Sequence, residues 1–222
     1  MPGCIVSAGR EPAHDLMKSL IDAYAKLFAE TAEFGGDLAR TARFALENVH
    51  WEDSPNMPEA SRHPITDEHL ETTCKRSGSK DSSATAVADA LLTVSDGLHW
   101  RSSSKCHDDG PDIVRLQRNF AVAIVVGEGG LLSSDKVCTG FSLQAPDIYY
   151  PPHAHRAEES YFIIGGDADW RVGAKPWFAV EPGDSIYHEP WARHAMQTNG
   201  QPLLTIWLWT SHLESDVLTV RD

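Results

Sequence analysis

The stretch of sequence that decides the fold is YYPPHAHRAEESYFIIGG, residues 149–166. Side chains along an extended strand alternate between its two faces, and His153, His155, Glu159 and Tyr161 share one parity, so we expect them on one side. Two imidazoles and one carboxylate on a common face can chelate a divalent transition metal. The stretch therefore predicts a metal site carried by a β-strand.

A second stretch supplies the remaining ligand. It reads EPGDSIYHEPWARHAMQT, residues 181–198, and its Pro-Gly-Asp turn begins a further strand. His194 follows Gly183 by eleven residues, which puts it on a different strand from the first stretch. The predicted ligand set is then three histidines and one glutamate, with one or two positions open for water or substrate.

The residues around these stretches predict a β-barrel or sandwich, because many short strand-like runs follow one another and turn residues separate them. The runs are 119–126, 137–144, 160–164, 169–172, 177–180, 185–188, 194–198 and 203–209.

The N-terminal part has a different, helical character. Apolar residues recur at three- and four-residue steps over 14–50, with a break at Gly35-Gly36, and 84–94 fits a short helix. Residues 53–83 are polar and predict a loop of low regularity. We therefore predict a mainly β, α+β chain. Residues 1–105 form a helical region that packs on the barrel, and 106–222 form the metal-binding barrel. The apolar face at 16–28 is expected to pack on the barrel or on a second subunit, as in a homodimer.

Composition narrows the partners and the compartment. The formal net charge is −13, which argues against binding to nucleic acid. No apolar run approaches a bilayer span and the N-terminus lacks the pattern of a secretory signal, so we expect a cytoplasmic protein with no membrane partner. Four separated cysteines are then expected as free thiols: Cys4, Cys74, Cys106 and Cys138.

The two stretches together resemble the motifs of the cupin family. The first motif is His-x-His, three or four residues, Glu, six residues and Gly, and it is met from His153 to Gly166. In the second motif, Gly183 and His194 match. Pro190 is displaced by one, Ala192 stands near the expected Gly and Thr198 replaces Asn, while Asp147 replaces a Gly that precedes the first motif. The resemblance implies a single cupin β-barrel, also called a double-stranded β-helix or jelly roll.

A narrower resemblance concerns the reaction. The run Tyr-Tyr-Pro-x-His-x-His-x-Ala-Glu-Glu-x-Tyr is similar to the bacterial cupin-type dimethylsulfoniopropionate (DMSP) lyases, which release dimethyl sulfide and acrylate. In that family, the tyrosine two residues after the glutamate ligand is the proposed base, and a second tyrosine lies five residues before the second histidine. These positions are Tyr161 and Tyr150 here.

The residues are consistent with that chemistry. A divalent metal ion, whether Fe, Mn, Zn, Co or Ni, stabilises charge on the substrate's carboxylate and favours a tyrosine phenolate beside it. Aromatic faces hold a sulfonium as they hold quaternary ammonium. Four tryptophans of the predicted barrel are candidates for that role: Trp177, Trp191, Trp207 and Trp209.

Several alternatives stay open. The same ligands would serve a mononuclear iron dioxygenase, or a non-catalytic cupin that binds a small molecule. His188 shares the parity of His194, but the ligand set is complete without it, so a role behind the ligands is expected. Tyr150 differs in parity from His153 unless the two intervening prolines shift the register.

Overall fold

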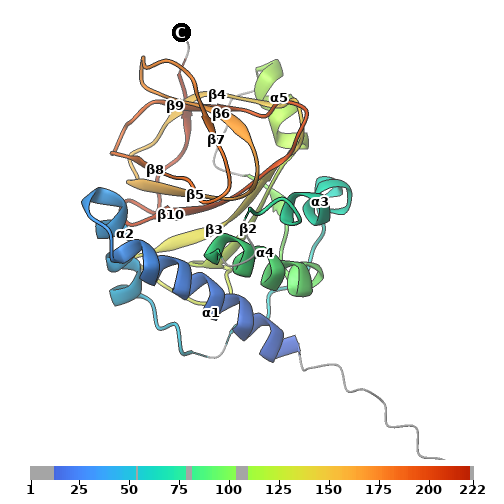
Figure 1. The fold of residues 1–222 in the computed structure, drawn as a ribbon, viewed down its shortest axis with the longest axis vertical. Helices are drawn as coiled ribbons and strands as arrows, with labels where there is room; N and C mark the ends of the chain where they lie inside the picture. Colours follow the sequence, from blue (N-terminus) through green and yellow to red (C-terminus); the bar gives the residue numbers. More distant parts are fainter. Residues whose placement is uncertain (1–12, 54, 79–81, 104–109, 221–222) are drawn as a thin grey trace, which may run out of the picture.

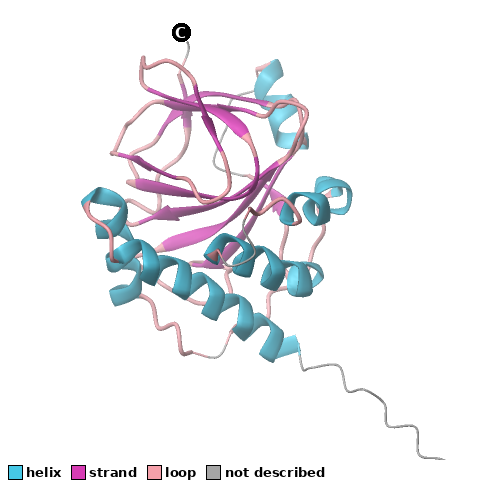
Figure 2. Cartoon of the chain, in the orientation of Figure 1, coloured by secondary structure: helices cyan, strands magenta, loops and turns pink. Residues whose placement is uncertain are grey.

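The computed structural model describes residues 13–53, 55–78, 82–103 and 110–220 of the 222-residue chain. Two antiparallel sheets face each other as a barrel, and most of the helices lie together on one side of it (Figures 1 and 2). The helices are α1 (Ala13–Ala32), α2 (Gly36–Asn48), η1 (Thr66–Leu70), α3 (Glu71–Cys74), α4 (Ser83–Val94), η2 (Ser95–Gly97) and α5 (Pro111–Arg118).

From β3 onward, the chain passes repeatedly from one sheet to the other. The first sheet has the order β1-β2-β3-β10-β5-β8, and the second has the order β11-β4-β9-β6-β7. Their bounds are β1 (Arg101–Ser102), β2 (Phe120–Val126), β3 (Cys138–Gln144), β4 (Tyr149–Ala154), β5 (Glu159–Gly166), β6 (Ala168–Val172), β7 (Phe178–Val180), β8 (Ser185–His188), β9 (His194–Gln197), β10 (Leu203–Trp209) and β11 (Leu218–Thr219). This is the cupin barrel with N-terminal helices that the sequence predicts.

The N-terminal helices pack on the outer face of the six-stranded sheet. Helix α1 presents one buried stripe at helical spacing, and burial of each large apolar side chain in it stabilises the fold by roughly 1.5–3 kcal/mol. Tyr24 meets Phe141 of β3 edge to face, with ring centroids 5.4 Å apart, and Phe28 lies 5.4 Å from Phe162 of β5. The apolar face of 16–28 therefore packs on the barrel of its own chain.

Strand β5 is covered on both sides. Every residue of Glu159–Gly166 is buried, because one face lines the barrel interior and the other meets the helices. On the outer face, the hydroxyls of Ser160 and Thr41 of α2 lie 2.8 Å apart. The strand that carries a predicted metal ligand is thus held by both layers.

The structure agrees with the predicted strands and departs from the predicted loops. The eight predicted strand runs correspond to β2, β3 and β5 to β10, and the helix break at Gly35-Gly36 is present. Residues 53–83, predicted to be irregular, contain helical turns at 66–74, and α5 was not predicted. The helical turns bury apolar residues of this stretch, such as Leu70. Strands β1 and β11 are too short to leave a pattern.

The predictions about the domain boundary, the cysteines and membrane-spanning segments have different outcomes. The proposed boundary between residues 105 and 106 and two of the cysteines, Cys4 and Cys106, lie outside the described residues. Cys74 is a buried free thiol. Among the described residues, no helix has the length and apolar character required to cross a bilayer.

Candidate metal centre

Three short segments carry the predicted ligands to one end of the barrel interior. His153 lies on β4, His155 follows that strand directly, and Glu159 begins β5. His194 begins β9 and pairs across the strands with His153. All four side chains are buried. The cupin spacing therefore places side chains from three strands against one another.

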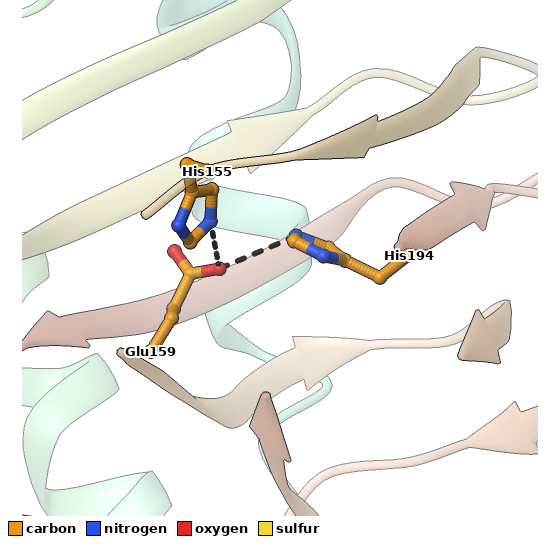
Figure 3. Close-up of side chains that lie close together, drawn as sticks. All are labelled: His155, Glu159 and His194. Atoms are coloured by element: carbon orange, nitrogen blue, oxygen red, sulfur yellow. Dashed lines mark hydrogen bonds and ion pairs between the residues drawn. The ribbon is translucent and has the colours of Figure 1, made fainter. Parts of the chain in front are cut away.

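Three of the four predicted ligands meet at one carboxylate oxygen. Nε2 of His155 lies 3.0 Å from Oε2 of Glu159, and Nε2 of His194 lies 3.3 Å from the same oxygen (Figure 3). The ligand atoms of these three residues all lie within 4.8 Å of one another. This spacing is compatible with one metal ion held between them.

Main-chain carbonyls set the orientation of the histidines. Nδ1 of His155 lies 2.9 Å from the carbonyl of Ala157, and Nδ1 of His194 lies 2.9 Å from the carbonyl of Ala192. A carbonyl only accepts hydrogen bonds, so each Nδ1 carries the proton. In the neutral ring, Nε2 then presents a lone pair to the site.

The unpaired nitrogen of His194 faces a hydrogen-bond acceptor. Among the described residues, Nε2 of His194 is buried without a hydrogen-bond partner, although the Glu159 carboxylate faces it. Burial lowers the pKa of His155, but the negative charge of Glu159 and the hydrogen bonds to Glu159 and Ala157 together outweigh burial, so the net shift of that pKa is upward. A buried imidazole lone pair that faces a carboxylate is stabilised by a cation between them, and these residues therefore fit a divalent transition metal.

The fourth predicted ligand, His153, lies beside this group. Its ring centroid is 4.0 Å from that of His194 and 6.5 Å from that of His155. Its Nδ1 lies 2.9 Å from the carbonyl of Pro151, which is the same arrangement as in the other two histidines. His153 is outside the three-residue group within 4.8 Å, so its role as a ligand stays a prediction.

The two predicted tyrosines line the same cavity as His153, His155 and Glu159. Tyr161 is on β5, two residues beyond Glu159, and its ring lies 6.3 Å from that of His194. Burial raises the pKa of the Tyr161 phenol well above its usual value, and the negative charge of Glu159 raises it further. Tyr150 is on β4 and is also buried. Both hydroxyls therefore belong to the interior of the barrel.

The four predicted tryptophans divide into two pairs. Trp207 and Trp209 line the cavity, and Nε1 of Trp209 donates to Oε1 of Glu159 over 2.7 Å. The other pair is not among the lining residues. The side chain of Trp177 is 38% exposed, with the Arg171 guanidinium 5.0 Å from its ring centroid. Trp191 is 54% exposed.

The backbone explains the position of Trp191. It adopts a left-handed conformation with φ of 66° in the turn before β9, where the cupin motif places its glycine. From the sequence, Ala192 was noted only as standing near that glycine position. The amide of Trp191 donates to the carbonyl of His155 over 2.8 Å, which ties the two motifs together. Asp147, which replaces the other motif glycine, is also left-handed with φ of 57°.

Several residues that line the cavity lie outside the two motifs. Its volume is about 100 Å³, which suits a small ligand. Lining residues missed by the sequence reading are Arg101, Ser103, Phe120, Val122, Ile124, Cys138, Leu213 and Val217. The alternating apolar residues of 119–126 could have indicated the wall on β2. Arg101 could not be found in this way, because it lies on a two-residue strand and reaches the cavity by pairing opposite Val122.

The fold is a cupin-type β-barrel, and its buried group of His155, Glu159 and His194 is compatible with a metal ion. The chain belongs to the dimethylsulfoniopropionate lyase family, whose model matches residues 38–205. It is 32% identical over 138 residues to the DMSP lyase DddQ of Ruegeria pomeroyi, an alignment that covers 62% of this chain and 67% of that protein.

Solved structures support the same fold. The crystal structure of DddQ from Ruegeria pomeroyi DSS-3 matches with a TM-score of 0.70 and 24% identity, covering 93% of this chain and 96% of that one. A structure from work on the DMSP lyases RdDddP and RnDddQII matches with a TM-score of 0.73 and 24% identity, covering 95% and 100%. The likeness extends over the N-terminal helices as well as the barrel.

Proposed function

We propose that this protein is a metal-dependent DMSP lyase that converts dimethylsulfoniopropionate to dimethyl sulfide and acrylate by β-elimination. One observation carries the proposal. In a member of the DMSP lyase family, Tyr161 lines the same small cavity as His153, His155 and Glu159. A base candidate and a candidate metal group thus share a space that fits a small substrate.

The reaction needs few groups from the protein. A base removes the proton from the carbon next to the carboxylate, and the electron pair of that C–H bond forms the new C=C bond. The C–S bond breaks with its electrons on sulfur, so dimethyl sulfide leaves as a neutral molecule and needs no acid. No serine or cysteine nucleophile is required.

Tyr161 is the proposed base. A phenol in this position resists ionisation, because burial and the nearby Glu159 carboxylate both raise its pKa. A bound divalent ion would supply positive charge that favours the phenolate and stabilises the charge developing on the substrate's carboxylate. Tyr150 is the rival base, since it lines the same cavity.

The proposed metal ligands are His153, His155, Glu159 and His194. Imidazole and carboxylate ligands suit several divalent ions, so Fe, Mn, Zn, Co and Ni all fit the donor set. Burial holds His153 in its neutral form, because it lowers the pKa of that histidine well below the usual value. A neutral imidazole is the form that binds a metal.

Aromatic faces are the proposed partners of the sulfonium. Trp207 and Trp209 meet edge to face with ring centroids 5.9 Å apart in the cavity wall. Phe120 and Tyr150 form a second aromatic pair in the wall, with centroids 5.3 Å apart. A cation over such faces gains about 0.5–2 kcal/mol.

Headspace detection of dimethyl sulfide from purified, metal-loaded protein given DMSP tests the proposal, with acrylate measured in the same sample. Equal amounts of both products, with and without oxygen, are expected from a lyase. Turnover that stops without oxygen would indicate a dioxygenase instead. Binding of DMSP without any product would indicate a non-catalytic module. Either of these results would overturn the proposal.

A further inference from the structure

A fourth histidine reaches the Glu159 carboxylate from a different side. His188 ends β8 and pairs directly opposite Glu159 on β5. Its side chain is fully buried, and its Nδ1 lies 3.5 Å from Oε2 of Glu159. Its ring stacks on that of His194, with centroids 3.9 Å apart and planes 22° from parallel. By position alone, His188 could be either a ligand or a support for one.

The neighbour behind His188 decides between these roles. Nε1 of Trp170, on β6, donates to Nε2 of His188 over 3.2 Å. An indole N–H is only a donor, so Nε2 of His188 must present its lone pair to Trp170. The proton of the neutral ring is then on Nδ1, the nitrogen that faces Glu159. A doubly protonated ring is also excluded, because Nε2–H would point at the indole N–H.

His188 therefore has the opposite orientation to the other three histidines. His153, His155 and His194 place Nδ1–H on a main-chain carbonyl and turn a lone pair inward. His188 turns an N–H inward instead. As a ligand through Nδ1, it would have to carry its proton on Nε2, against the indole N–H of Trp170, so two donors would face each other at 3.2 Å.

The carboxylate then faces an N–H group on each side. Trp209 donates to Oε1 of Glu159 over 2.7 Å, and Nδ1 of His188, which has no hydrogen-bond partner among the described residues, lies 3.5 Å from Oε2. The two side chains flank Glu159 within the six-stranded sheet, because Trp209 on β10 and His188 on β8 both pair directly opposite Glu159 on β5. A donor on each side of a carboxylate ligand restricts its rotation.

We propose that His188 is a positioning residue of the metal centre, which donates Nδ1–H to Glu159 and is kept in that tautomer by the indole N–H of Trp170. The inference depends on the metal site of the proposed function and not on the reaction. Loss of such a partner typically lowers metal affinity by about 10–100-fold.

Metal affinity measured by competition with a chelator tests the inference without any turnover. The His188→Leu variant should bind one ion about 10–100-fold more weakly. The His188→Asn variant, whose amide NH₂ occupies the place of Nδ1–H, should recover most of the affinity. The Trp170→Phe variant keeps an aromatic ring against Tyr161 but lacks the N–H, and it should also bind more weakly.

The control is Trp100→Phe, which removes the hydrogen bond from another buried indole to the carbonyl of Ser95. It should lower stability without changing metal affinity. Wild-type affinity in His188→Leu, or equal losses in the Asn and Leu variants, would overturn the proposal.

A second measurement uses the wild-type protein, so it tests the inference even if the variants fail to fold. Long-range ¹H–¹⁵N NMR of the wild-type, zinc-loaded protein should show His188 protonated on Nδ1 and the three other histidines not protonated on Nε2. A proton on Nε2 of His188 would overturn the proposal. Because neither measurement uses DMSP, a chain without lyase activity would still give a clear result.

Discussion

The ring of Tyr150 lies flat against that of His153, with centroids 3.9 Å apart and planes 10° from parallel. Their residue numbers differ by three, and a regular strand would direct their side chains to opposite faces. The register of β4 against β9 shifts between them, since Tyr150 pairs with Met196 and His153 with His194. Strand β4 therefore contains one extra residue at this point.

The extra residue falls at Pro151-Pro152. Proline has no N–H to donate to a sheet ladder and is found in strands at edges and bulges. The bulge turns Tyr150 to the same face as His153 and so brings a second phenol into the cavity. The register shift that would align the two residues is thus present, and the choice between two tyrosines becomes an experimental question.

The first prediction separates those tyrosines. Tyr161→Phe keeps the ring and its edge-to-face contact with Trp170, and we expect it to keep the metal and to lose about 10²–10⁴-fold in kcat. Tyr150→Phe should reduce kcat much less. Steady-state assays at saturating DMSP, with metal content measured on the same samples, provide the comparison. Near-normal turnover in Tyr161→Phe with an inactive Tyr150→Phe would exchange the two roles.

The second prediction concerns the ligands. The double variant His155→Ala, His194→Ala should contain no stoichiometric metal, because it removes both lone pairs that face Glu159. His153→Ala should bind an ion more weakly, as expected for a fourth ligand. His50→Ala is a suitable control, since that side chain is 81% exposed. Elemental analysis after dialysis gives the answer, and full metal content in the double variant would refute the site.

The third prediction distinguishes the tryptophans. Trp207→Leu removes an aromatic face from the cavity and should raise KM for DMSP about 5–30-fold while kcat changes less. Trp177→Leu should leave KM unchanged, because that ring is outside the lining and stacks with Arg171. Trp209→Phe should in addition weaken metal binding, since it removes the donor to Glu159. An unchanged KM in Trp207→Leu would argue against an aromatic site for the sulfonium.

The fourth prediction links the helices to β5 through Glu158. Burial would raise the pKa of this carboxyl, but hydrogen bonds from Arg40, Thr210 and Tyr187 outweigh it and lower the pKa from 4.5 to about 2. A lowered pKa means that the stabilisation is complete above pH 4.5 and is lost as the pH falls towards 2. We expect about 1–2 kcal/mol at pH 7, since Arg40 is half exposed to solvent.

Urea unfolding of Glu158→Gln measures this effect. The variant should be less stable than the wild type at pH 7, and the difference should shrink at pH 3.5. The same change at Glu128, which lies in an exposed turn, should alter the free energy of unfolding by less than about 0.5 kcal/mol at both pH values. A difference that grew on acidification would contradict the assigned direction of the pKa shift.

The proximity of His155, Glu159 and His194 could be predicted from sequence because local spacing determines it. His155 and Glu159 belong to one short segment, and His194 begins β9, eleven residues after Gly183 of the Pro-Gly-Asp turn. The strand runs were predictable for the same reason, since alternation and turn residues are local signals.

Features that depend on contacts between residues far apart in the sequence were harder to predict. Trp191 resembled an interior aromatic in the sequence, yet its left-handed backbone carries it to the surface. Arg101 reaches the cavity through a cross-strand pair with Val122 that no motif encodes. The orientation of His188 depends on Trp170, eighteen residues away, and so could be recognised only once the two side chains were seen together.

Strand β5, buried on both faces, has a consequence for how this chain can vary. Its inward residues, Glu159 and Tyr161, line the cavity of the proposed site, while its outward residues, Ser160 and Phe162, contact the helices. A substitution on either side moves the same backbone. Selection for a new substrate and selection for thermal tolerance therefore act on one strand at once, and directed evolution of the site should accumulate compensating changes in α1 and α2, far in sequence from the residues under selection.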